Sequence, residues 1–456
     1  MKKIFLLLSL VTSCALLSAN DRVELPYYES FLGDIGNFTI NDVNLGSLNK
    51  VWSVTSAYGM KATGYYSGNH AAESWLVSPL IALPNAQNIC LSFYQVLNYL
   101  SDESLSHAQV KISTDNGNSW TNLTFLNNPT GHNWTFYHSC VLLDQYAGQD
   151  VRIAFVYSST DAVAPTWEIK EFSVKIAPTS GQCGESLNWN LDTNSGLLTV
   201  TGSGDMWDSI PNLKWHTYAS LIEKVNLPNG LTSIGIDAFA NCQRLQSVII
   251  PEGVTSIAPG AFSYCFNLAS VNLPNSVTRL GQGAFWECNS LTNPIYNSRI
   301  FAFMPRTFEG SYVIPDGIVS VASFSFQNCS KLQKIILPES TERIGQHAFA
   351  YCDSLQTVVC KATVPPTCAH SVFVVTDFDS SYPKMTSSAL YVPATSLEDY
   401  KTADTWKDFN PILTISTESV ENISAIYDES TKILRNGNVY ILYGDKTYTL
   451  TGQEVK

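Results

Sequence analysis

Hydrophobic positions between Leu221 and Asp353 recur with a period of 23 residues. Turn prolines mark this period at Pro228, Pro251 and Pro274, and the register resumes after one irregular stretch. A cysteine occupies the same place in five units: Cys242, Cys265, Cys288, Cys329 and Cys352. One unit cannot bury its apolar face alone, whereas stacked units can, so the period predicts a solenoid.

Each unit is expected to hold two β segments, one ending at the proline and one at residues such as 254–257. The repeated cysteines are expected to stack as small buried side chains inside successive coils, because a free thiol packs like a small hydrophobe. A solenoid offers a long surface and no enclosed pocket, so binding is the expected function.

Residues 21–177 lack the period and show a different β pattern. Turn-rich segments such as 115–119 separate short alternating or apolar runs. These runs lie at 75–81, 89–96, 108–113, 151–157 and 167–174. Many short strands between turns are typical of a sandwich. The predicted fold class is therefore mainly β, with a β-sandwich followed by a solenoid.

The remaining segments complete the predicted organisation. Lys2 and Lys3 precede an apolar run and a small-residue cleavage site, which predicts a signal peptide. The alternative, a lipoprotein box ending at Cys14, fits less well because apolar residues follow it. The expected boundaries are 1–20 for the signal peptide, 21–177 for the sandwich, 178–220 for a β-rich cap, 221–376 for the solenoid, 377–415 for a second cap and 416–456 for a linker and tail.

The composition of the chain restricts the classes of partner that it could bind. The chain has 456 residues, 26 basic and 39 acidic, and a net charge of −13. It shows no basic stripe, which argues against nucleic acid and anionic lipid as partners. No apolar stretch after the signal peptide reaches the ~18 residues of a membrane span. The expected location is therefore exported, at the cell surface or outside the cell.

The repeat motif Leu-x-x-Val-x-Leu-Pro-x-x-Val-Thr-x-Ile-Gly-x-x-Ala-Phe-x-x-Cys resembles the BspA-like leucine-rich repeats of Bacteroidetes and some treponemes. The irregular insert at 294–315 resembles a variant rung of those proteins. Residues 432–455 resemble the C-terminal sorting signals of type IX secretion, although the tail is shorter than a full sorting domain. The resemblance implies a surface protein.

The N-terminal segment carries a second resemblance. Residues 25–31, 74–79, 113–120 and 167–174 look like the jelly-roll modules called cleaved-adhesin or choice-of-anchor domains, which are related in shape to MAM domains. That family implies adhesion or carbohydrate-like recognition and often a structural calcium. The matching positions here are Glu29 and Glu171, which could equally be solvated carboxylates.

No catalytic constellation is found. The sequence has no His-Glu-x-x-His, no Gly-x-Ser-x-Gly and no phosphate-cradling glycine loop, and its seven histidines lack metal-ligand spacing. We therefore expect no enzyme and no required cofactor.

Binding is expected on outward positions of the solenoid. The first strand of each unit offers Lys224, Asn226, Ser247, Ile249, Ser270, Asn272, Lys334 and Ile336. The turn after the recurring Phe offers the aromatic residues Tyr264, Trp286 and Tyr351, because exposed aromatics are favoured anchors. The hypothesis is an adhesin whose solenoid contacts extracellular-matrix or other cell-surface proteins. The alternative is glycan capture by the N-terminal jelly roll.

Overall fold

A computed structural model describes residues 22–100, 105–208, 213–374 and 388–415, together with the backbone of four strands near the C-terminus. The expected signal peptide, the lipoprotein box and most of the 416–430 linker lie outside the described residues. Contacts divide the chain into two units: Met1–Leu231 with Asp237–Val248 and Phe262–Leu268, and the remaining residues to Lys456. No helix among the described residues is long and apolar enough to cross a membrane.

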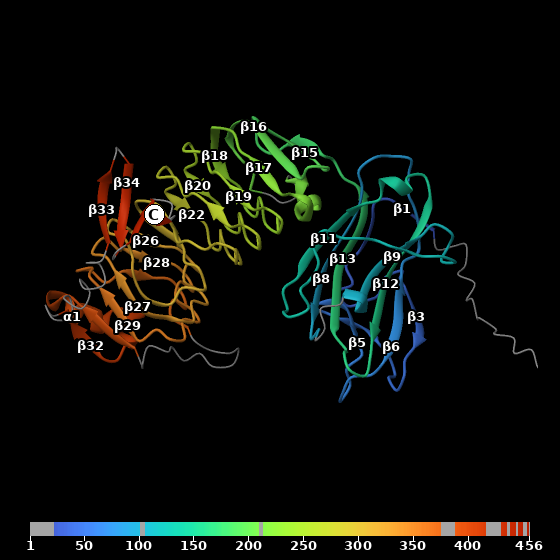
Figure 1. Cartoon of the computed structure of the whole chain (residues 1–456), viewed down its shortest axis with the longest axis horizontal. Coiled ribbons are helices and arrows are strands. Elements are labelled where there is room, and N and C mark those ends of the chain that lie inside the picture. Colours follow the sequence, from blue (N-terminus) through green and yellow to red (C-terminus); the bar gives the residue numbers. More distant parts are fainter. Residues whose placement is uncertain are drawn as a thin grey trace, which may run out of the picture. The chain divides into compact units, whose positions relative to one another are not determined.

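The first unit begins with two sheets that face each other across one core (Figure 1). One sheet has the order β1-β7-β12-β6-β3, with β9 also on β12 and β10 on β9. Its strands are β1 (Arg22–Glu24), β3 (Thr39–Asn44), β6 (Ala72–Val77), β7 (Leu80–Ala82), β9 (Ala108–Ser113), β10 (Thr121–Asn122) and β12 (Asp150–Ser159).

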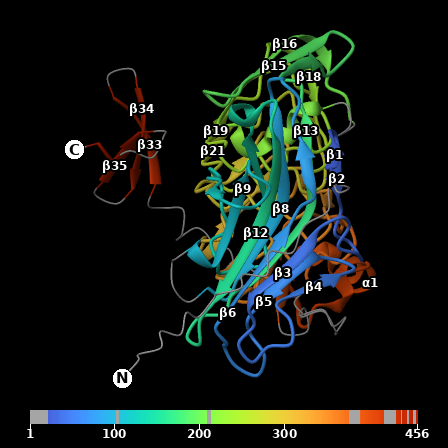
Figure 2. The ribbon, with the colours of Figure 1, turned by 90° about the vertical axis from the view of Figure 1, so that its right-hand side faces the viewer.

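The facing sheet has the order β11-β8-β13-β5-β4, with β2 on β13. Its strands are β2 (Tyr27–Glu29), β4 (Trp52–Thr55), β5 (Gly59–Thr63), β8 (Ile89–Asn98), β11 (Tyr137–Leu142) and β13 (Thr166–Ile176). Figure 2 shows long ribbons for β8 and β13, which are neighbours in this sheet, and for β12 of the facing sheet. Phe93, Phe155, Trp167 and Phe172 are fully buried between the sheets, where their rings pack edge to face.

A cap follows the sandwich. Strand β15 (Leu187–Asp192) alternates strictly between buried and exposed residues, as expected for a sheet with one solvated face. It pairs with β14 (Ser180–Gln182) and β16 (Leu197–Asp205), and the 3₁₀ helix η4 (Lys214–Leu221) follows. Trp215 of η4 is buried and stacks on Phe239, the first phenylalanine of the repeats.

The repeats form a β-solenoid of stacked coils, as the 23-residue period predicts (Figure 1). Each regular coil contributes two short parallel segments, and equivalent residues of successive coils pair, such as Ser256 with Arg279. The strands are β17 (Lys224–Asn226), β18 (Gly230–Ile234), β19 (Ser247–Val248), β20 (Ser256–Ile257), β21 (Ser270–Val271), β22 (Arg279–Leu280), β23 (Ile295–Tyr296), β24 (Ile300–Phe303), β25 (Gly310–Val313), β26 (Ser320–Val321), β27 (Leu332–Leu337), β28 (Arg343–Ile344), β29 (Thr357–Cys360) and β30 (Thr367–Cys368).

Two internal ladders hold the coils together. The five repeated cysteines are buried and form no disulfide, as expected for small side chains packed inside successive coils. Cys265 donates to the Phe239 carbonyl of the preceding coil at 3.1 Å. The repeated phenylalanines stack face to face, with Phe326 on Phe349 at 4.9 Å between ring centroids.

The second unit ends in its own closing elements. These are β31 (Ala389–Val392), η6 (Ala394–Ser396), α1 (Leu397–Thr402), η7 (Trp406–Asp408) and β32 (Ile412–Thr414). Trp406 and Phe409 cover the ring of Phe373, and the Tyr400 hydroxyl donates to the Ala362 carbonyl at 2.8 Å. A four-stranded antiparallel sheet follows, formed by β33 (Ser430–Arg435), β34 (Asn438–Tyr443), β35 (Lys446–Thr449) and β36 (Glu454–Val455). Its role in sorting stays a prediction.

Candidate binding surface of the solenoid

The strand positions expected to face outward are exposed in the first coils. The exposed residues are Lys224, Asn226, Ser247, Ile249, Ser270 and Asn272. Ile249 is 79% exposed, the largest value among the exposed large hydrophobic residues described. The Asn272 amide, however, is bound to both backbone groups of Ile250, at 2.7 and 2.8 Å. Asn272 therefore bridges two coils through its amide.

The later coils differ from the prediction. Lys334 is only half-buried, and Ile336, expected to face outward, is fully buried. The outward expectation for Ile336 was wrong because a second apolar cluster covers that face of β27. Ile336 and Val359 pack there against Val313, Tyr391 and Ile415. Two of these neighbours, Tyr391 and Ile415, lie beyond the repeats, so strand alternation could not reveal them.

The three aromatic turn residues do not form one column. Tyr264 and Tyr351 precede the repeated cysteine by one residue and have positive φ values of 58° and 59°. Glu287 holds this position in the intervening coil, with φ 61°, and Trp286 lies one residue earlier. Tyr351 is 37% exposed, whereas Tyr264 is half-buried against Phe266. Trp286 therefore takes a different direction from the two tyrosines.

Trp286 belongs to a stack of three rings. Its indole lies 5.9 Å from the Phe324 ring at an interplanar angle of 24°, and Phe324 lies 5.4 Å from the His347 ring at 23°. Phe324 and His347 share a column of positive φ values, which Asp237, Gly260 and Gly283 occupy in the earlier regular coils. A phenylalanine at φ 63° is a strained residue that its surroundings must hold in place.

The stack lines a notch created by the irregular coil. Cys288 and Cys329 are 41 residues apart, five fewer than two full periods. Phe301 lies in strand β24 yet already stacks on Phe326, at 4.8 Å, so the short coil reaches the phenylalanine ladder without the usual turn. The missing turn leaves a notch between Trp286 and Phe324, with Ala302 and Phe303 among its lining residues.

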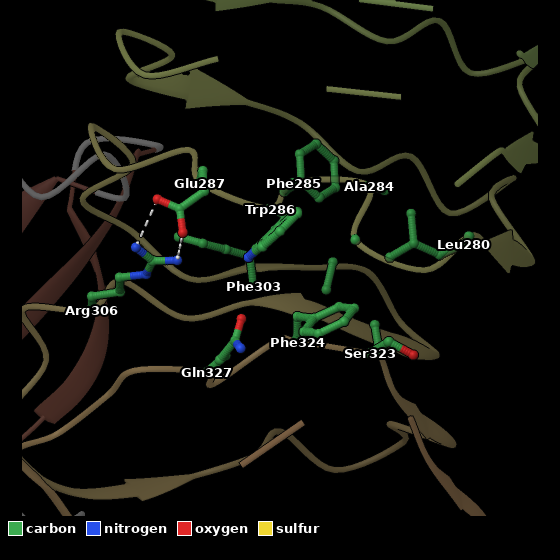
Figure 3. Close-up of a pocket in the computed structure, with 14 residues that line it drawn as sticks. Leu280, Ala284, Phe285, Trp286, Glu287, Phe303, Arg306, Ser323, Phe324 and Gln327 are labelled. Carbon is green, nitrogen blue, oxygen red and sulfur yellow. Dashed lines mark hydrogen bonds and ion pairs between the residues drawn. The ribbon is translucent and has the colours of Figure 1, made fainter. Parts of the chain in front are cut away.

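An ion pair closes one side of the notch. The Arg306 guanidinium donates two hydrogen bonds to the Glu287 carboxylate, at 2.7 and 3.0 Å. Figure 3 shows this pair on one side, with Phe324 and Ser323 on the other. Gln327 also lines the notch, and its buried Oε1 has no hydrogen-bond partner among the described residues. His347 lies at the end of the ring stack. Burial lowers the pKa of this histidine, and the charge of His370 lowers it further.

The repeats of the solenoid match a known family of repeats. Residues 214–314 and 301–378 match the BspA type leucine rich repeat region in six copies. The solenoid matches the BspA type of leucine-rich repeat. The family that matches is a family of repeats and not a family of enzymes. No curated protein matches the chain.

Several solved structures show similarity to part of the chain. A leucine-rich repeat protein from Eubacterium ventriosum is 17% identical, with a TM-score of 0.25, over 52% of this chain and 84% of that one. A leucine rich cell surface protein from Faecalibacterium prausnitzii is 18% identical, with a TM-score of 0.22, over 54% and 97%. The K3 cleaved adhesin domain of Lys-gingipain from Porphyromonas gingivalis is 17% identical, with a TM-score of 0.24, over 33% and 97%.

The carboxylates proposed for calcium lie in the sandwich, away from the BspA-type repeats. Glu29 pairs with Phe172, whose ring is in the core, and accepts hydrogen bonds from the Tyr27 hydroxyl and the Asn37 amide at 2.7 and 3.0 Å. Glu171 has a φ of 56° and lies at the β-bulge between Lys170 and Ser173, so strand alternation does not set the direction of its side chain. Burial raises the pKa of Tyr28, and the charge of Glu171 raises it further.

No group of three or more His, Cys, Asp or Glu side chains that could hold a metal occurs in the part of the chain described. Calcium binding stays a prediction.

Sequence reasoning missed Phe324, His347 and the Glu287–Arg306 pair. The signal that could have found them is the deficit of five residues between Cys288 and Cys329, because a shortened coil must omit a turn. The contacts across the gap could not be assigned from the period, since the period itself breaks there.

Proposed function

We propose that the chain is an exported surface protein whose BspA-type solenoid binds a protein partner through its turn face, with Trp286 as the central anchor. The observation that carries this proposal is the notch beside Trp286, which combines an exposed indole, a stacked phenylalanine and a paired arginine. Trp and Arg are enriched among residues that dominate protein interfaces. The export expected from Lys2, Lys3 and the following apolar run supports a surface location.

The notch is suited to binding a protein partner because its side chains are already fixed in position before the partner binds. Trp286 is 36% exposed yet stacked, so little side-chain freedom remains to be lost when a partner covers it. The bidentate Glu287 holds Arg306 at the rim, and Glu287 itself is only 18% exposed at its side chain. A partner would therefore meet a rigid aromatic surface with a fixed polar edge.

The experiment uses the full chain against immobilised fibronectin and laminin, measured by surface plasmon resonance. Trp286→Ala should weaken binding at least about tenfold, as expected for an aromatic hot spot. Ile249→Asp tests the strand face in the same assay. Tyr58→Ala, an exposed aromatic change in the sandwich, is the matched control and should leave binding unchanged.

Two results would contradict the proposal. Binding that Ile249→Asp abolishes and Trp286→Ala leaves intact would move the site from the notch to the strands. Absence of binding to either matrix protein would remove matrix proteins as the partner class. The alternative function, glycan capture by the sandwich, depends on a different surface around Trp134.

A further inference from the structure

One long segment of the sandwich contains no charged side chain. Residues 116–143 include no Asp, Glu, Lys or Arg, although the whole chain has 65 such residues among its 456. The same 28 residues include six asparagines and four threonines. They form β10, the loop after it and β11, which is the edge strand of its sheet. The exposed amides and hydroxyls of this segment lie in β10 and in the loops on either side of it, and they form a neutral surface next to this edge strand.

Two exposed aromatic rings meet on this surface. Trp134 of the loop is 48% exposed, and Tyr99, at the end of β8, is 65% exposed. Their centroids are 5.6 Å apart and their planes are nearly perpendicular, at 83°. Two other tryptophans of the sandwich differ, since Trp52 is buried against Trp167 and Trp120 packs on Trp75. Trp134 is the one of the three that is most available to a ligand.

The backbone holds both rings in place. Tyr99 has a φ of 62°, a conformation that costs an aromatic residue free energy, and the Asn98 side chain accepts a hydrogen bond from its amide at 2.8 Å. The Leu100 amide donates to the Gly131 carbonyl at 3.0 Å and so ties the two loops together. On the other side of Trp134, the Thr135 amide donates to the Asn133 side chain at 3.0 Å. The perpendicular arrangement is therefore fixed from both segments.

We propose that Tyr99 and Trp134 form a binding platform for a neutral carbohydrate, separate from the protein-binding notch of the solenoid. The C–H groups of a pyranose ring would pack on an aromatic face, which is apolar and carries a negative quadrupole. Thr130 and His132, which precede Trp134 in the same loop and are exposed, would hydrogen-bond sugar hydroxyls. The same chemistry disfavours sulfated, sialylated or uronic-acid glycans, because residues 116–143 offer no Lys or Arg to pair with an anion.

A protein partner fits this surface less well than a sugar. Protein interfaces gain specificity and association rate from complementary charges around the contact. The Lys170 ammonium lies 4.2 Å from the centroid of the Phe136 ring, and Arg152 donates to the Asn116 side chain at 2.7 Å, so both cations are engaged within the sandwich. Sugar hydroxyls need neutral donors and acceptors, which this edge supplies.

The test is affinity electrophoresis of the full chain in native gels containing galactan, xyloglucan, mannan or, as the acidic comparison, polygalacturonate. At least one neutral polysaccharide should retard the chain, and polygalacturonate should not. Trp134→Ala should weaken the binding at least about tenfold. Tyr99→Asn should also weaken it, and asparagine is chosen because it tolerates the positive φ. Tyr66→Ala, at a 75% exposed tyrosine elsewhere in the sandwich, is the matched control.

The outcomes separate this site from the solenoid. Trp286→Ala should leave retardation unchanged, so failure of one proposal does not imply failure of the other. Retardation by polygalacturonate alone, equal retardation of wild type and Trp134→Ala, or no retardation in any neutral gel would each overturn the platform. Loss of fibronectin or laminin binding in Trp134→Ala without any sugar effect would assign the surface to a protein instead.

Discussion

Two histidines of the first unit, His138, which is buried, and His216, which is half-buried, lie where a positive charge is costly. His138 of β11 packs its ring on Tyr94 at 5.1 Å, and its Nδ1 has no hydrogen-bond partner among the described residues. Burial lowers the pKa of His138 to about 3, and the charges of His216 and Lys175 lower it further. Burial also lowers the pKa of His216 to about 4, against an opposing backbone interaction with Asp237. Both rings are therefore neutral in the folded protein at ordinary pH.

Stability should fall as the pH decreases from about 6.5, the value at which histidines of the unfolded chain titrate. Below that pH the unfolded state binds protons that the folded state excludes, and each histidine removes up to about 1.4 kcal/mol per pH unit until its folded pKa is reached. Urea unfolding between pH 7.5 and 4.5 measures this slope. His138→Phe keeps a ring on Tyr94, and His216→Phe removes the second titration. Each should make the slope shallower, and an unchanged slope in both variants would contradict the assignment.

Single positions also show how far the repeat determines its residues. The buried cysteine column could be predicted because identical positions of stacked coils share one environment, and Cys242, Cys288 and Cys329 are all fully buried. The burial of Ile336 could not be predicted, because residues that lie beyond the repeats, such as Tyr391 and Ile415, cover its side chain. Trp286 was recognised as an outward aromatic, but its direction depends on Phe324, which lies 38 residues later.

At the scale of elements, a shortened coil changes the surface more than any substitution within a regular coil. The fold class and the two parallel strand rows follow from the period, since the hydrophobic pattern fixes which side of each segment is buried. The notch does not follow from the period. It arises where strand β24 replaces a turn and where Arg306, just after that strand, reaches the Glu287 turn of the preceding regular coil. Such contacts join coils of different length, so no recurring sequence pattern predicts them.

The Glu287–Arg306 pair should stabilise the short coil by a measurable coupling. The side chains are 18% and 26% exposed, between a surface pair and a buried one, so we expect a coupling free energy of about 1 kcal/mol. The measurement is a double-mutant cycle with Glu287→Gln, Arg306→Met and the double variant, using urea unfolding of the full chain. The solvent-exposed pair of Lys331 with Glu309 offers a matched cycle, whose coupling should be smaller. Equal coupling in the two cycles would show that the notch does not shield its ion pair.

At the scale of the whole molecule, the contacts do not separate the sandwich from the cap at the expected boundary near residue 177. Both lie in the first unit, together with parts of the early coils. The Tyr218 hydroxyl of η4 donates to the Ala177 carbonyl at 2.7 Å, and the Cys90 thiol of β8 approaches the Thr217 carbonyl at 3.8 Å. The outward face of β8 and β11 is thus covered by the cap, and this explains why Cys90 and Cys140 are buried although they do not face the sandwich core.

This cover predicts the reactivity of the two thiols. Residues 22–177 contain only Cys90 and Cys140, so a fragment with these bounds has two thiols to count. In the intact chain both should react slowly with iodoacetamide, because they are buried and because burial raises the pKa of the Cys140 thiol. Without η4 the fragment should expose both and react at least tenfold faster. Peptide mapping after timed labelling measures the rates, and tryptophan fluorescence confirms that the fragment is folded.

A longer fragment, residues 22–221, is the matched control because it restores η4. Slow labelling in this fragment and fast labelling in 22–177 would assign the protection to the cap helix. Equally slow labelling in both fragments would mean that the sandwich buries its own cysteines, and the cap would then be a neighbour of the sandwich and not part of its cover. The same comparison decides which fragment should be used to examine the sugar platform in isolation, since Tyr99 and Trp134 lie at the ends of these same strands, β8 and β11.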